Sequence, residues 1–123
     1  MSSPTQRTLA LLRRNGYMAE VVEKRLPRGF VTRDLFGCID VLAVRPGSPV
    51  LGVQATSRTN QSARYHKAVA IAELRTWLEA GCQFEVWGWA LAGPRGKRKL
   101  WTPSIRAVTL ADIGAVDCPG GAA

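Results

Sequence analysis

The segment FGCIDVLAV (residues 36–44) decides the fold of this chain, together with VLGVQAT (residues 50–56), which follows the turn RPGSP. Each is a short apolar run bounded by glycine or proline, a pattern typical of buried strands joined by a tight turn. The first run carries one acid, Asp40, and the second ends in Gln54 and Thr56, two polar residues at period two. A carboxylate in an apolar strand is costly unless it is paired or binds a metal. We therefore predict that the rest of the chain holds Asp40 opposite Gln54.

The length and composition indicate one globular domain. The chain has 123 residues, of which 46% are hydrophobic and 21% charged, enough for a single core. We expect residues 1–113 to form this domain and residues 114–123, which end in CPGGAA, to form a flexible tail. No run of about 18 apolar residues predicts a membrane span, and the first residues lack the pattern of a signal peptide, so a cytoplasmic location is expected. The three cysteines are far apart and form no CxxC motif, which indicates reduced thiols.

The charge is strongly positive and unevenly distributed. The formal net charge is +8, and residues 93–106 hold five Arg or Lys residues with no acid. Residues 7–33 hold seven Arg or Lys residues against two Glu. Such clustering favours a polyanionic partner, with nucleic acid as the first candidate. The basic turn at residues 94–99 is expected to grip backbone phosphates, although a solvated loop is the alternative.

Periodicity predicts an α/β fold. Residues 5–15 and 61–80 read as helices, and residues 17–24, 35–44, 50–56 and 84–91 read as strands. A further strand, residues 97–108 with an interruption at Pro103, is the hairpin partner of residues 84–91. The order α-β-β-β-α-β with an added C-terminal hairpin strand predicts a mixed central sheet flanked by helices. Three of the tryptophans, Trp77, Trp87 and Trp101, are expected to pack between helix and sheet, with stacking on unpaired bases as the alternative.

This order of elements, with an acid in the second strand and polar residues two apart in the third, resembles the PD-(D/E)XK nuclease superfamily over about residues 5–90. The layout is similar to Holliday-junction resolvases, to the VRR-NUC group and to small phage or prophage proteins of that type. The resemblance implies a restriction-endonuclease-like αβββαβ core. It also implies a Mg²⁺- or Mn²⁺-dependent endonuclease that cleaves DNA phosphodiester bonds, and a homodimer where the substrate is a junction with two-fold symmetry.

The resemblance also assigns site residues. Asp40 matches the metal-binding Asp of the second strand. Gln54 stands where the family has Glu or Asp, and Thr56 stands where it has Lys. The Gln54 carbonyl oxygen can still serve as a ligand for a hard cation. Asp34 is a candidate second acid, since six residues separate it from Asp40 and an unbroken strand would place both on one face. A strand break at Gly37, with Asp34 as a turn or cap acid, is the alternative.

A cation that replaces the missing strand lysine is predicted on the second helix. Lys67 is in phase with an apolar stripe formed by Ala63, Ala70, Leu74, Trp77 and Leu78. That phase is expected to direct Lys67 toward the sheet, with Arg64 one turn earlier, because helical side chains lean toward the N-terminus. The predicted catalytic set is Asp40, Gln54 and Lys67, and the predicted metal ligands are Asp40, Asp34 and Gln54, with Glu20 as a further candidate ligand. The predicted DNA contacts are Arg33, Arg64, Arg95, Lys97, Arg98 and Lys99.

Two other functions stay open at the level of sequence. The absence of Glu at position 54 and of Lys at position 56 favours a DNA-binding module that retains the nuclease fold without catalysis. The basic surface is also compatible with an adaptor that meets an acidic protein. Salt-dependent DNA binding without an effect of magnesium would indicate the first alternative, and failure to bind any nucleic acid would indicate the second.

Overall fold

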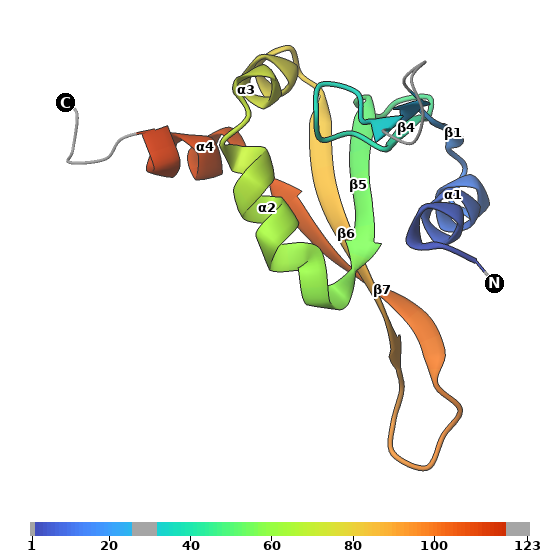
Figure 1. Cartoon of the computed structure of the whole chain (residues 1–123). Coiled ribbons are helices and arrows are strands. Elements are labelled where there is room, and N and C mark those ends of the chain that lie inside the picture. The colour runs from blue at the N-terminus through green and yellow to red at the C-terminus, as the bar shows by residue number, and fades with distance from the viewer. Residues whose placement is uncertain (1, 26–31, 118–123) are drawn as a thin grey trace.

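Five strands form one mixed sheet with helices on both faces in the computed structural model, which describes residues 2–25 and 32–117 (Figure 1). The predicted α/β class and mixed central sheet are thus confirmed. The helices are α1 (Pro4–Arg14), α2 (Gln61–Val69), α3 (Ala72–Glu79) and α4 (Leu110–Asp117), with a short 3-10 turn at Arg58–Asn60. The strands are β1 (Met18–Val21), β2 (Lys24–Arg25), β3 (Thr32–Arg33), β4 (Val41–Val44), β5 (Leu51–Ser57), β6 (Gln83–Ala92) and β7 (Leu100–Val108).

The order of strands in the sheet is β1-β4-β5-β6-β7, and β2 pairs with β3 in a separate two-stranded ribbon. Strands β1, β4 and β5 are antiparallel neighbours, whereas β6 runs parallel to β5. This parallel pairing requires a crossover, which α2 and α3 provide. Strand β7 returns antiparallel to β6 and forms the outer edge of the sheet.

Helix α1 covers one face of the sheet. The Ser3 Oγ accepts a hydrogen bond from the Gln6 backbone N–H at 3.2 Å, and a proline stands in the first turn, as favoured at a helix N-terminus. Leu9 and Leu12 are buried against β4, β5 and β6. Thr8 is also fully buried, and its Oγ1 accepts a hydrogen bond from Trp89 Nε1 at 2.9 Å. The helix predicted at residues 5–15 is therefore present and docks through this stripe.

The crossover differs from the single helix predicted at residues 61–80. It breaks between α2 and α3 at Ile71, which has extended backbone angles of φ −85° and ψ 120°. Val69 and Ile71 both pack into the core that lies between the crossover helices and the sheet. Residues two apart lie on opposite sides of a continuous helix, so the break allows both to face the same core.

The break also corrects the predicted helical phase. The buried face of α2 consists of Gln61, Tyr65, Ala68 and Val69. Ala63 and Ala70, which defined the predicted stripe, are exposed, and Lys67 and Arg64 are exposed with them. The expectation that this phase directs Lys67 toward the sheet is therefore wrong.

Three boundaries also differ from the sequence prediction. Residues 35–40 form a turn rather than the start of a strand, as described below. Strand β7 continues through Pro103, which pairs with Trp89 on an edge strand, where a missing N–H is tolerated. Helix α4 occupies the start of the predicted tail, and residues 118–123 lie outside the described part of the chain. None of the helices in the described ranges is long and apolar enough to cross a membrane.

The sequence contains an N-terminal capping signal for helix α4 that hydrophobic periodicity does not reveal. The Thr109 backbone N–H donates to Asp112 Oδ2 at 2.8 Å, and the Asp112 backbone N–H donates to Thr109 Oγ1 at 3.4 Å. This reciprocal arrangement is a capping box, readable in sequence as Thr-x-x-Asp. Ile113 is buried in the core below it.

Candidate metal centre

A tight turn brings two acids together at the start of β4. Leu35 and Ile39 form an antiparallel bridge, and the Leu35 N–H donates to the Ile39 carbonyl at 2.9 Å. Phe36 and Gly37 close this turn with φ values of 55° and 81°. Left-handed backbone is uncommon for a side chain like that of Phe36, so the turn holds a strained position. One step outward from the bridge, Asp34 and Asp40 stand on facing arms of the turn.

Asp40 also connects three strands of the sheet. Its carbonyl accepts from the Val22 N–H at 2.8 Å, and its own N–H donates to the Val53 carbonyl at 2.9 Å. Its Oδ2 accepts a hydrogen bond from the Ala55 N–H at 3.0 Å. The carboxyl group thus pairs with a backbone N–H of β5 that lies past the first residue of β4. The residue is only 7% exposed. Asp40 is therefore positioned by backbone on both sides, which makes its carboxyl group a well-defined point in the fold.

A third acid completes the cluster. Glu23, Asp34 and Asp40 each offer one carboxylate oxygen, and these oxygens all lie within 4.8 Å of one another. We call these residues the acid cluster. Glu23 is exposed, Asp34 half-buried and Asp40 buried, so the cluster opens to solvent on one side. Hard cations such as Mg²⁺ bind oxygen ligands and keep several waters, and this donor set fits that requirement.

Sequence reasoning named Asp40 and Asp34 but proposed Glu20 as the further acid. Glu20 pairs with Leu42 within β1 and β4, and it is not part of the acid cluster. Glu23 takes that place because the register of β1 on β4, continued by the hydrogen bond between Val22 and Asp40, ends beside it. Only the observed register identifies Glu23, because the sequence predicts both strands but not how they pair.

Burial and mutual repulsion raise the pKa of Asp40 to about 8. Desolvation is the largest cause, followed by the side-chain hydrogen bond with Asp34, while the bond from the Ala55 N–H acts in the opposite direction. The negative charges of Asp34 and Glu23 add to the increase. Near neutral pH, Asp40 therefore keeps a proton that a bound cation would displace.

The same surroundings affect Cys38, which lies inside the turn. Its pKa rises to about 12, first because the thiol is buried and then because of the charges of Asp34, Asp40 and Glu73. The thiol therefore stays protonated and behaves as a small apolar side chain. Cys38 therefore contributes packing to the turn and not a reactive thiolate.

A groove leads to the acid cluster. It has a volume of about 330 Å³ and is lined by Val22, Arg33, Asp34, Leu35, Phe36 and Glu73. Arg33, a predicted DNA contact, thus lies in the same groove as one of the three acids. A guanidinium beside metal-binding carboxylates is suited to hold a phosphate group.

Gln54 and Thr56 lie on β5 next to this site. They are 4% and 7% exposed, and Ala55 between them supplies the N–H that binds Asp40. Gly52, on the same side of the strand as Gln54, faces Ile39 and Trp77, so Gln54 points to the face that carries the turn. Gln54 is therefore a nearly buried amide on the face of β5 that carries the turn.

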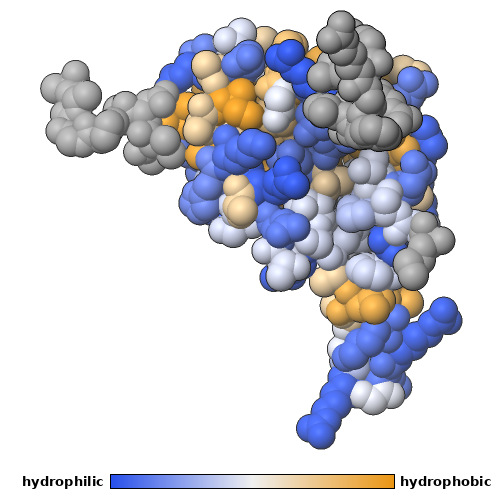
Figure 2. All heavy atoms as spheres, in the orientation of Figure 1, coloured by the Kyte–Doolittle hydropathy of each residue, from blue (hydrophilic) through white to orange (hydrophobic). Residues whose placement is uncertain are grey.

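The other predicted cations lie apart from the acid cluster. Arg64 and Lys67 are on the exposed side of α2. The four tip cations are all exposed between β6 and β7, and Figure 1 shows this hairpin projecting away from β1 and β4. Figure 2 shows the same projection as a hydrophilic end below a hydrophobic band. The tip cations are Arg95, Lys97, Arg98 and Lys99.

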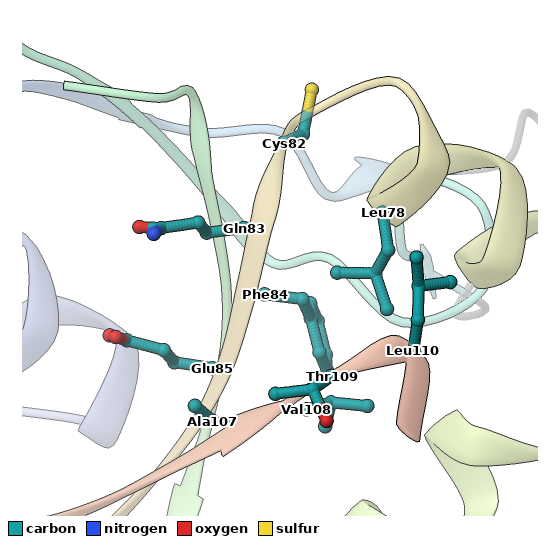
Figure 3. Close-up of a pocket in the computed structure, with 9 residues that line it drawn as sticks. All are labelled: Leu78, Cys82, Gln83, Phe84, Glu85, Ala107, Val108, Thr109 and Leu110. Atoms are coloured by element: carbon teal, nitrogen blue, oxygen red, sulfur yellow. The ribbon is translucent and has the colours of Figure 1, made fainter. Parts of the chain in front are cut away.

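Another cavity, of about 260 Å³, lies between α3, β6, β7 and α4 and is shown in Figure 3. Leu78, Phe84 and Leu110 extend to one side of β6, while Gln83 and Glu85 extend to the other. Its interior is therefore mainly apolar and offers no group of converging acids or bases. This leaves the acid cluster as the better candidate for chemistry.

Comparison with protein-family models, with curated proteins and with solved structures gave no match. The function is therefore argued from the residues of this chain.

Proposed function

We propose that the chain is a divalent-metal-dependent endonuclease that hydrolyses DNA phosphodiester bonds with a restriction-endonuclease-like core. The observation that carries this proposal is the acid cluster, three carboxylate oxygens within 4.8 Å around a buried aspartate. Supporting it, the sheet has the antiparallel β1-β4-β5 order with a parallel β6, reached through a helical crossover. The strong positive charge of +8 fits a polyanionic substrate.

The roles follow from position. Asp40, Asp34 and Glu23 would hold Mg²⁺ or Mn²⁺, and the Gln54 carbonyl oxygen would contribute a neutral ligand or orient a water. The ion would supply an activated water and stabilise negative charge on the attacked phosphate. Arg33, in the adjoining groove, would hold that phosphate. Lys67 and Arg64 would serve as outer DNA contacts, since both are exposed.

The test is cleavage of supercoiled, linear, flap and four-way-junction DNA in Mg²⁺ or Mn²⁺, with EDTA as the blank. Asp40→Asn should abolish cleavage, and Asp34→Asn and Glu23→Gln should each reduce it strongly. Glu73→Gln is the matched control, because this acid lines the same groove but is outside the acid cluster. Absence of cleavage of every substrate, or full activity in Asp40→Asn, would refute the proposal. Preference for the junction together with a dimer in solution would support the resolvase-like form.

A DNA-binding module without catalysis is the second candidate. It is favoured by the neutral residues at Gln54 and Thr56 and by the solvent-facing position of Lys67. Calorimetric titration with Mn²⁺ separates the two candidates. A bound ion that disappears in Asp40→Asn supports the enzyme, whereas DNA binding that does not respond to Mn²⁺ supports the module.

A further inference from the structure

A second surface on the opposite face of the sheet has a different chemistry. A groove of about 390 Å³ runs between α1 and β7. Its lining consists of Arg7, Ala10, Leu11, Arg14, Trp89, Leu100, Trp101, Thr102 and Pro103. We call this the α1–β7 groove. It is the largest of the cavities described above, and none of its lining residues is acidic.

Helix α1 presents two faces, and only one of them is used by the core. Thr8, Leu9 and Leu12 are buried against the sheet. Arg7 and Arg14, two turns apart on another face, flank the groove. No Asp or Glu occurs in residues 4–14 or in residues 100–108, so neither wall can neutralise these cations.

Trp101 is the aromatic floor of this groove, and it corrects a prediction. Trp87 is 3% exposed and Trp89 is 6% exposed, but Trp101 remains 47% exposed rather than packed between helix and sheet. The Arg7 guanidinium lies over its ring, 3.7 Å from the centroid. Leu100 beside it is 60% exposed. One face of the indole carries the Arg7 guanidinium and nearly half of the side chain is exposed, so the pair offers a flat, positively charged surface to a flat, negatively charged ligand.

We propose that the α1–β7 groove binds single-stranded nucleic acid, with an unpaired base stacked on Trp101 and neighbouring phosphates held by Arg7 and Arg14. Stacking on an aromatic ring requires a base whose face is free, which a duplex does not provide. The exposed basic tip of the β6–β7 hairpin continues the positive surface from the same strand, β7. A second copy of this chain is a poorer occupant, because each copy carries the same net charge of +8.

The inference does not depend on the acid cluster, so it is tested in EDTA, where no metal-dependent cleavage occurs. A fluorescein-labelled oligo(dT) and a duplex of equal length are titrated with the whole protein, and binding is followed by anisotropy. We expect the single strand to bind at least about tenfold more tightly than the duplex. Trp101→Ala should weaken single-strand binding by about 5- to 150-fold, the range for loss of one stacked base. Trp101→Phe, which keeps a stacking ring, should retain most of the affinity.

Arg7→Gln and Arg14→Gln test the cations separately from the ring. Each should lower the slope of log K against log salt by about 0.7, the value for one phosphate contact on a single strand. Arg45→Gln is the matched control, since Arg45 also lies over an aromatic ring, 4.3 Å from the Tyr17 centroid, but outside the groove. Both Arg variants of the groove change exposed or half-exposed side chains, so they keep the test open if Trp101→Ala fails to fold. Equal affinity for duplex and single strand, or equal effects of Arg7→Gln and Arg45→Gln, would overturn the proposal.

Discussion

Asp34 and Asp40 face each other across the turn at residues 35–39, and one carboxylate oxygen of each lies within 4.8 Å of the other. Two carboxyl groups at this distance are compatible with one shared proton or with one bound cation, but not with two unbalanced charges. The burial of Asp40 makes that choice energetically important, because a charge there loses most of its hydration.

The hydrogen bond from Ala55 to Asp40 predicts a contrast between two substitutions. Asp40→Asn keeps an oxygen that accepts from the Ala55 N–H, and its amide can donate to Asp34. Asp40→Ala leaves the Ala55 N–H without that acceptor, which should cost about 1–3 kcal/mol of unfolding free energy. Urea denaturation at pH 7 in EDTA measures both. Equal stability of the alanine variant and the parent would contradict a structural role for this bond.

Asp40 should also make stability depend on pH. Its pKa is about 8 in the folded chain and 3.8 when the side chain is free in water, so between these pH values the folded state holds a proton that the unfolded state has lost. The stabilising effect of that proton is complete below about pH 4 and is lost as the pH rises through about 8. The unfolding free energy should therefore fall with pH, by up to about 1.4 kcal/mol per pH unit from this group.

The control for that slope is Asp40→Asn, which has no proton to lose. Denaturation midpoints at pH 5, 6, 7 and 8 in EDTA should fall for the parent and change less for the variant. The unfolding free energy of the parent should exceed that of the variant most at the lowest pH of the series. This difference should shrink as the pH rises. Parallel curves would show that Asp40 does not titrate in this range.

Sequence reasoning succeeded where one local signal agreed with the tertiary fold. The cap and the Leu9–Leu12 stripe identified α1, and the apolar runs around Asp40 and Gln54 identified neighbouring strands. It failed for α2, because the need to bury both Val69 and Ile71 breaks a helix that periodicity alone would continue. The error in helical phase then misplaced Lys67.

The candidate site shows the same division. Asp40 was identified as the acid of a buried strand and Asp34 from its separation from Asp40 in sequence, but a turn rather than an unbroken strand brings the two together. The left-handed Phe36 and Gly37 form a turn that no pattern in the chain announces, apart from the glycine itself. Glu23 depends on where the β1–β4 register ends, and such a register is set by long-range packing rather than by local sequence.

Metal binding should release the proton held by Asp40. Because this proton must leave before the carboxylate binds a cation, the apparent affinity for Mn²⁺ should increase about tenfold per pH unit below pH 8 and level off above it. Calorimetry at pH 7 in two buffers with different ionisation enthalpies counts the protons released, and the expected number is close to one. Release of no proton by the parent would exclude Asp40 as a ligand.

Gln54→Glu should strengthen the binding of Mn²⁺ at the acid cluster and lower the stability of the protein without metal. Gln54 is 4% exposed and precedes Ala55, whose N–H binds Asp40, so a new carboxylate there is desolvated and adjoins this site. Without metal the variant should unfold at a lower temperature than the parent, and saturating Mn²⁺ should reverse the difference. Cleavage of DNA in Mn²⁺ should be faster for the variant than for the parent. Thr56→Val, at a neighbouring buried position on the same strand face, is the control that changes β5 without adding charge.

The β6–β7 hairpin should contribute to nucleic-acid affinity without contributing to folding. Arg95, Lys97 and Arg98 are exposed at the end of a projecting arm, so changing all three to glutamine should leave the melting temperature within about one or two degrees of the parent. Binding to DNA should lose up to about two or three units of salt slope, since each lost phosphate contact removes about 0.7–0.9. The comparison variant is Arg58→Gln with Arg64→Gln, which removes exposed cations next to and within α2. A salt slope that falls with the α2 pair and not with the hairpin triple would place the principal phosphate contacts on the helical face instead of on the arm.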